Sequence, residues 1–489
     1  MTALSGLMRR GWWASLVFCC ASSAFADQFD LVREVVRDQM AVGNVPSVAV
    51  AVVQDGKIVW QEGFGWADKA KKIPATADTV YSLASISKPF TATALMMLVE
   101  RGRIDLDKPI NDYLGASKLV AQVGDVREAT VRRVANHTSG LPTYWQFYYE
   151  DRGPSRPAME QSIARQGRLL AAPGEVFVYS NFGYGVLEYA IERRSGRSYA
   201  KFLRDEIFQP LGMRHSAVNR EPDFGAQVAV RYAVDGTVIP FYDFDHRGAS
   251  AVFASAHDLA QFALAHLKTP LPAQKRILSD ASIDAMAQPG EGAAAAYYGL
   301  GWQFRPRYGL RTYGHTGDMG GVATRLALFP DQRLGIVVLS NSENKITRII
   351  EQSIVNTLLP ETIVASRREF KPEAGWIGSW QGAVVADEAR TEIRLDIDAR
   401  GRVFARVGSA PRTEVILVQV VDGQLQLDEV PGDLGTEVAA RYPYRLSFSL
   451  KPRGEVMNGA VTAVSRPLAD RVGSGVSYWT ELKRVDAAR

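Results

Sequence analysis

A serine and a lysine three residues apart are the first side chains in this sequence that could carry out chemistry together. In Ser85-Ile86-Ser87-Lys88, a helical backbone would place both on one face, because residues three apart are neighbours there. A partly buried lysine loses its charge and can then accept the serine proton. The pair therefore predicts a hydrolase that attacks an amide or ester carbonyl with Ser85 and forms an acyl-enzyme.

The spacing alone is a weak signal, because the chain contains it three times: at Ser85 and Lys88, at Ser198 and Lys201, and at Ser342 and Lys345. Only the first copy precedes a long apolar segment, residues 88–102, which is typical of a buried helix. Pro89 is tolerated only near a helix start, so the helix should begin close to Ser85. The other two copies fall on polar segments, and the sequence favours Ser85 as the nucleophile.

Tyr179-Ser180-Asn181 is the second candidate stretch, and it precedes a predicted helix at residues 183–194. A tyrosine in such a loop is usually a packing residue. Near a lysine, however, its phenol loses a proton more easily and can act as a general base. The Asn181 amide offers a donor and an acceptor, which suits it to orient Lys88 and a substrate amide. We therefore predict that Tyr179 is catalytic and that Asn181 binds substrate.

The third candidate stretch is His315-Thr316-Gly317-Asp318, at the predicted start of a strand. Gly317 would let a substrate backbone come close, and Thr316 could bind a substrate carboxylate or carbonyl. The backbone N–H of Asp318, with that of Ser85, could form an oxyanion hole. Taken alone, the stretch would be a tight turn with a surface histidine, so its assignment to substrate binding depends on the other two stretches.

Other chemistries lack their signatures in the sequence. The six histidines form no HExxH or similar pair, so we expect no metal and no other cofactor. A G-x-S-x-G nucleophile elbow and a phosphate-binding P-loop are both absent. The formal net charge is only +4, without a long basic block, and nucleic acid is not an expected partner.

Residues 1–26 are typical of a cleavable export signal. Two arginines precede an apolar stretch, and Ala24-Phe25-Ala26 has the small–x–small pattern of a cleavage site after Ala26. Both cysteines, Cys19 and Cys20, lie inside it, so a periplasmic or secreted protein without thiols is expected. An uncleaved membrane anchor is the alternative. No later apolar run reaches the roughly 20 residues needed to span a bilayer.

The elements that must position these residues fall into two groups. Residues 45–66 should form a hairpin, helices are predicted at 88–102, 183–194, 199–207, 258–267 and 346–359, and strands at 321–328 and 334–339. The simplest packing is one mixed α/β domain, its sheet built from both ends of this segment. After Trp376, short alternating strands at 391–397, 403–407, 414–421, 446–450 and 476–482 predict an all-β barrel or sandwich.

In order and type, these motifs resemble the class C β-lactamase and penicillin-binding-protein family of serine hydrolases. Two further stretches, Asn136 to Pro142 and Tyr298 to Trp302, add to a likeness that covers residues 28–359. The resemblance implies an antiparallel sheet covered by helices, with a helical lobe and the active site between them. It implies that Ser85 is the nucleophile and that Lys88 and Tyr179 share proton transfer, in an order that the sequence leaves open. Asn181 and the 315–317 strand would hold the substrate.

The expected boundaries are a signal peptide at 1–26, a β-lactamase-like hydrolase domain at 27–362, a linker at 363–375 and a β domain at 376–489. The β domain resembles the lipocalin-like or barrel domains of some relatives. It could gate the cleft, dimerise, bind cell-wall peptidoglycan or only stabilise the protein.

His315 departs from the β-lactamase pattern, in which lysine is usual at this position. Histidine there resembles the DD-peptidases, D-aminopeptidases and esterases of the same superfamily, and at neutral pH it is only partly charged. We therefore rank D-amino-acid peptides first, small esters second and β-lactams third as substrates. The main alternative is a catalytically silent sensor or scaffold, against which the complete set of candidate catalytic residues argues.

Overall fold

The computed structural model describes residues 28–485, except for 152, 154, 220–226, 291–296, 305–309, 360–371, 387–388, 416, 422, 437–443 and 466–474. The predicted export signal, with both cysteines, lies outside the described residues, and so does most of the predicted linker.

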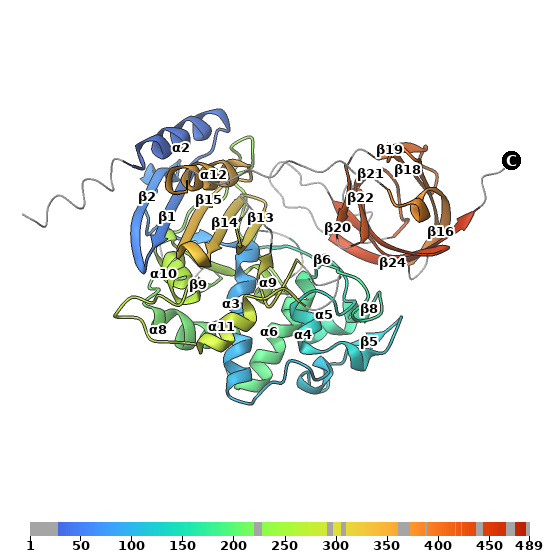
Figure 1. Ribbon diagram of the computed structural model, residues 1–489, viewed down its shortest axis with the longest axis horizontal. Coiled ribbons are helices and arrows are strands. Elements are labelled where there is room, and N and C mark those ends of the chain that lie inside the picture. Colours follow the sequence, from blue (N-terminus) through green and yellow to red (C-terminus); the bar gives the residue numbers. More distant parts are fainter. Residues whose placement is uncertain are drawn as a thin grey trace, which may run out of the picture.

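An antiparallel sheet forms the centre of the larger part of the molecule (Figure 1). The register pairs Val48 with Ser340 and Gln54 with Leu334, so the N-terminal hairpin lies beside the last strand of this region. The predicted sheet, built from both ends of the segment, is thus confirmed. Its strand order is β12 (Gln303–Phe304), β13 (Tyr313–Met319), β14 (Val322–Phe329), β15 (Leu334–Ser340), β1 (Ser47–Gln54), β2 (Lys57–Asp68) and β3 (Ile73–Pro74).

Helices cover both faces of this sheet, which explains the almost unbroken apolar run of β1. Val48 and Val50 belong to a core shared with α2 (Asp30–Val42) and α12 (Ile346–Leu358). The intervening alanines face the larger core under α10 (Ala256–His266). A strand that is buried on both faces needs apolar residues at successive positions. Figure 1 shows α2 and α12 on one side of the sheet and α10 on the other.

The helical lobe implied by the resemblance packs around α3 (Ser87–Glu100), which is buried along nearly its whole length. Against it lies α6 (Asn181–Ser195), whose N-terminus is capped by Ser180. The Ser180 hydroxyl accepts the N–H of Gly183 at 2.9 Å, which satisfies one free donor of the first turn. Further helices are α4 (Val131–Ala135), α5 (Met159–Gln166), α7 (Tyr199–Leu203), α8 (Gln209–Leu211), α9 (Arg247–Ser250) and α11 (Asp280–Met286).

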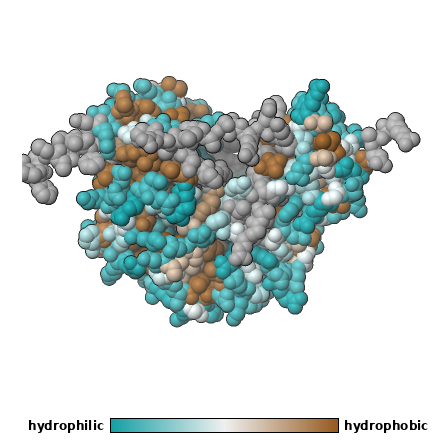
Figure 2. All heavy atoms as spheres, viewed as in Figure 1, coloured by the Kyte–Doolittle hydropathy of each residue, from teal (hydrophilic) through white to brown (hydrophobic). Residues whose placement is uncertain are grey.

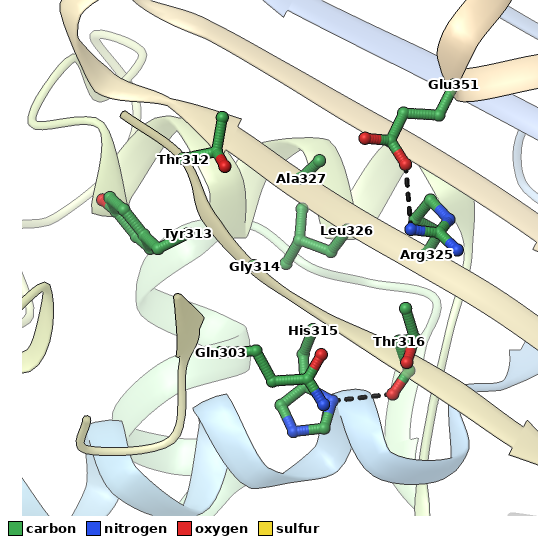
Figure 3. Close-up of a pocket in the computed structure, with 10 residues that line it drawn as sticks. All are labelled: Gln303, Thr312, Tyr313, Gly314, His315, Thr316, Arg325, Leu326, Ala327 and Glu351. Carbon is green, nitrogen blue, oxygen red and sulfur yellow. Dashed lines mark hydrogen bonds and ion pairs between the residues drawn. The ribbon is translucent and has the colours of Figure 1, made fainter. Parts of the chain in front are cut away.

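A buried ion pair joins α12 to the sheet. Arg325 of β14 lies 2.9 Å from Glu351 of α12, and their side chains are 11% and 0% exposed. Figure 3 shows the pair at one side of a small cavity, with Gln303 and His315 at the other. Its volume of about 20 Å³ would hold a single water, so it is too small for a substrate.

Glu351→Gln should lower the free energy of unfolding by about 3 kcal/mol, because the substitution removes the carboxylate that lies 2.9 Å from the buried Arg325 charge. Urea denaturation followed by tryptophan fluorescence measures the loss. The double variant Arg325→Met, Glu351→Leu removes both charges and should be much closer to the unchanged protein. If the single and double variants lost the same free energy of unfolding, the cost would not come from a buried charge that has lost its carboxylate.

The C-terminal β-sheet is a nearly closed barrel (Figure 1). Its interior is filled by alternate residues of the strands, such as Leu425, Leu427 and Phe448. The sequence predicted one strand at 414–421, but the structure has two, and it adds β16, β21 and β23 to the predicted set. In order, the strands are β19 (Thr413–Val415), β18 (Val403–Val407), β17 (Ala389–Ile397), β16 (Gly378–Ala386), β24 (Gly475–Val485), β23 (Val456–Ser465), β22 (Tyr444–Arg453), β21 (Gln424–Val430) and β20 (Leu417–Val421).

A short strand from the larger part of the molecule, β6 (Tyr144–Trp145), extends the barrel sheet by pairing with β24. Most of the surface in the view of Figure 2 is hydrophilic on both parts of the molecule, with smaller hydrophobic areas between. Among the described residues, no helix has both the length and the apolar character required to cross a bilayer.

Candidate active site

Ser85 lies in the 3-10 helix η1 (Ala84–Ile86), which leads directly into α3. The preceding Ala84 has φ of 48°, a left-handed backbone conformation that costs a non-glycine residue energy and tends to occur at functional sites. The turn is held by Ser87, whose hydroxyl donates to the Ala84 carbonyl at 2.7 Å and accepts the N–H of Val252 at 2.9 Å. The chain thus fixes the backbone on both sides of the predicted nucleophile, and Ser85 itself is partly exposed.

Lys88 is fully buried, and its ammonium group lies 3.1 Å from the Ser85 hydroxyl oxygen. It also donates to Asn181 Oδ1 at 2.7 Å and to the Ala249 carbonyl at 3.2 Å. Burial lowers the pKa of the Lys88 amine well below its usual value, because the charged form is poorly solvated there. An amine with a lowered pKa at hydrogen-bond distance from a hydroxyl can act as its general base.

The other two Ser-x-x-Lys copies lack this arrangement. Ser198 caps the start of α7, and Lys201 is half exposed and forms an ion pair with Asp205 at 2.6 Å. Ser342 is buried in a turn, where its carbonyl accepts the Asn344 amide, and Lys345 is exposed to solvent. Only the first copy therefore combines a buried lysine with a partly exposed serine within its reach.

Tyr179 and Asn181 enter the site from the segment that leads into α6. The Lys88 nitrogen lies 4.7 Å from the centre of the Tyr179 ring, so the phenol and the amine are neighbours. The Tyr179 backbone is held by Thr143, whose hydroxyl donates to the Tyr179 carbonyl at 2.8 Å. The predicted hydroxyl, amine, phenol and amide thus come together from positions far apart in the sequence.

His137 is a residue of the site to which the sequence assigned no role. Its Nδ1 accepts the backbone N–H of Ser180 at 3.1 Å, so the proton of the neutral ring is on Nε2. The ring packs against those of Tyr179 and Tyr298, with centroids 4.4 Å away in both cases. Burial lowers the pKa of His137 well below its usual value. His137 therefore holds the Tyr179 segment as a neutral ring. The only sequence signal was its place in the Asn136 to Pro142 stretch.

His315 lies on β13 but is not exposed to solvent. Its Nδ1 faces the Thr316 carbonyl at 2.6 Å, so it carries the proton, and its Nε2 lies 2.8 Å from the Tyr298 hydroxyl. Burial keeps the pKa of Tyr298 high, so this hydroxyl remains a donor to His315. The surface histidine of the alternative interpretation is not found, and both ring nitrogens of His315 are engaged by the protein rather than directed at a ligand.

Gly317 is explained by contact with the protein itself. A Cβ at this position would lie 2.2 Å from the Leu83 carbonyl and 2.3 Å from the Thr324 hydroxyl. The close packing of β13 on η1 is therefore sufficient to require a glycine here, and the predicted role of Gly317 in substrate binding stays a prediction. This packing brings Thr316 and Asp318 beside the turn that carries Ser85.

Comparison with known proteins assigns the chain to a family. A family model described as "Beta-lactamase" matches residues 32–354. The chain belongs to the beta-lactamase family. Within the curated proteins, Penicillin-binding protein 4* of Bacillus subtilis (strain 168) is 30% identical over 319 residues, which are 60% of this chain and 68% of that protein. Membership of the beta-lactamase family supports an activity of the serine hydrolase type.

Two solved structures show how far the fold likeness extends. A class C beta-lactamase, 21% identical, covers 71% of this chain and has a TM-score of 0.59, with 99% of its own chain matched. SurE, also 21% identical, covers 94% of this chain with a TM-score of 0.65 and is itself matched over 100% of its length. At this identity the likeness concerns the fold alone, and in SurE it spans most of the chain.

Proposed function

We propose that this protein is an exported serine hydrolase that cleaves amide or ester bonds through an acyl-enzyme on Ser85. The observation that carries the proposal is the 3.1 Å contact between the buried Lys88 amine and the Ser85 hydroxyl. No acidic side chain forms an ion pair with Lys88 among the residues that the structure describes, and a buried amine of this kind is costly to charge, so its presence beside a hydroxyl favours proton transfer. Export rests on the predicted signal at residues 1–26.

In the proposed reaction, Lys88 takes the proton of Ser85 as the serine oxygen bonds to the substrate carbonyl carbon. The N–H groups of Ser85 and Asp318 are the proposed donors to the carbonyl oxygen, which becomes negatively charged. Collapse of this intermediate breaks the amide or ester bond, and the leaving group receives a proton through Tyr179. Water then releases the acyl group by the reverse sequence of proton transfers, which regenerates Ser85.

Among substrates, we propose D-amino-acid peptides and small esters ahead of β-lactams. The support is His315, which stands where lysine would offer a permanent charge to a substrate carboxylate. Its ring is buried and hydrogen-bonded within the protein. A substrate carboxylate would therefore gain little from it, which favours esters, and peptides that place no carboxylate beside this strand, over β-lactams.

Covalent labelling tests the proposed function directly. A fluorophosphonate should modify Ser85, and peptide mass mapping of the labelled protein identifies the modified residue. Ser198→Ala serves as the matched control, because it removes the serine of a second Ser-x-x-Lys copy and should leave labelling unchanged. A folded protein that is not labelled at Ser85 would overturn the proposal.

The lowered pKa of Lys88 predicts the pH dependence of the reaction. The general base must be neutral, so activity should rise with pH as the Lys88 amine loses its proton, and this rise should occur well below the pH at which an ordinary lysine titrates. With an ordinary amine, activity would rise only near pH about 10. The measurement is kcat/KM for a neutral ester across the pH range in which the protein remains folded. A rise confined to strongly alkaline pH would show that Lys88 is not the base.

A further inference from the structure

A cavity of about 170 Å³ lies between the Tyr179 segment and the outer face of the C-terminal barrel. One water takes up about 30 Å³ of liquid, so the space suits a side chain or an acyl group. Tyr179 borders it, and the opposite wall consists of residues of β21, β22 and β23. Most of the wall residues point out of the barrel, because they alternate with Leu427 and Leu450, which face the barrel core. Phe448, which also borders the cavity, belongs to that core.

The two walls of this cavity differ in chemistry. The hydrolase side presents the aromatic residues Trp145, Phe177 and Tyr179. The barrel side presents polar side chains, including the Asp428 carboxylate, which accepts the Ser447 hydroxyl. No lysine or arginine is among the described residues that line the cavity. Aromatic faces opposite a carboxylate favour a positively charged group, through cation–π attraction and a charge-assisted hydrogen bond.

Several contacts hold the barrel in place against this segment. β24 pairs with β6, and Gly475 lies opposite Trp145, whose ring would be only 2.5 Å from a Cβ added at that glycine. Lys451 donates to the Glu175 carbonyl at 2.6 Å, and Arg453 forms an ion pair with the Glu175 carboxylate at 3.1 Å. The barrel thus contacts both segments that flank Tyr179 in space, the one with Trp145 and the one with Glu175.

From this arrangement we infer that the barrel supplies a specificity pocket, in which Asp428 binds a positively charged group on the part of the substrate that extends past Tyr179. The inference rests on the proposed function, since it names the substrate class of the same site. The ligand chemistry is a primary ammonium, from either the α-amine or a basic side chain of an amino acid. Asp428 is a specificity-determining residue and takes no part in bond cleavage.

The test compares the rates at which three fluorophosphonates label Ser85. One is a neutral alkyl compound, and the other two end in a primary ammonium on a short or a long chain. In the unchanged protein, at least one charged compound should react about 10-fold faster than the neutral one. The chain length that reacts faster distinguishes an α-amine from a side-chain amine. In Asp428→Asn, which keeps an acceptor for Ser447, the preference should disappear while the neutral rate stays the same.

Glu414→Gln is the matched control, because it removes one carboxylate from an exposed position on β19 and should leave the preference intact. Equal rates for neutral and charged compounds in the unchanged protein would overturn the pocket while leaving the proposed function standing. So would an equal slowing of the neutral and charged compounds in Asp428→Asn. A folded protein that none of the compounds labels would instead refute the proposed function, and the pocket with it.

Discussion

Replacing Ser85 by alanine should lower kcat/KM for a short-chain nitrophenyl ester by about 10⁴-fold or more, because the variant lacks the hydroxyl that forms the acyl-enzyme in the proposed reaction. The neighbouring Ser87 cannot take over. Its hydroxyl is buried and already donates to the Ala84 carbonyl while accepting the N–H of Val252. Removing one hydroxyl from a partly exposed position should leave folding intact.

Hydrolysis rates of the purified variant, with the thermal midpoint as a folding check, measure this effect. Ser198→Ala provides the matched control and should retain full activity. If Ser85→Ala kept more than a small fraction of the hydrolysis rate, the nucleophile would have to be sought elsewhere.

Lys88→Met should lower the same rate constant by about 10³-fold, which is within the range for loss of a general base. Methionine approximates the length of the lysine stem and suits a fully buried position, so packing with Tyr184 and α6 is largely kept. The amide of Asn181 loses its donor, and a modest fall in stability is expected to accompany the loss of activity.

The rate at which the fluorophosphonate labels Ser85 distinguishes the loss of the general base from the loss of stability. In Lys88→Met, Ser85 is present, so the fluorophosphonate should still react with it, but far more slowly, in protein shown to be folded by circular dichroism. Lys201→Met, in the exposed copy of the motif, should label at the normal rate. A Lys88→Met protein that labels normally would assign proton transfer to Tyr179 alone.

The parts of the site that sequence could predict are those fixed by local pattern. Pro89 and the apolar run after it located the start of α3, and the position of Ser85 just before that start followed from them. The hairpin of β1 and β2 was equally local, since alternation and a turn are enough to predict it. The order of the three motifs along the chain and the residue types within them were enough to indicate the family.

Contacts between distant backbone atoms could not be predicted in this way. The Ala249 carbonyl that accepts from Lys88 has no side-chain signature, and its approach depends on the packing of α9 against α3. A glycine at position 317 signals a close approach without naming the partner, so its contact with the Leu83 carbonyl could not be predicted from the sequence. The contact between the barrel and the Tyr179 segment could not be predicted either, because no local pattern indicates which outer face of a barrel packs against another domain.

The pairing of β6 with β24 limits how this protein could be rebuilt from parts. A hybrid that carries a different barrel would need an unpaired strand edge where Tyr144 can pair, and a glycine opposite Trp145. Otherwise the Trp145 indole would be displaced, together with the short segment before it. That segment contains Thr143, whose hydroxyl donates to the Tyr179 carbonyl. Grafting experiments among relatives should therefore transplant β6 and the barrel together, as a single unit of exchange.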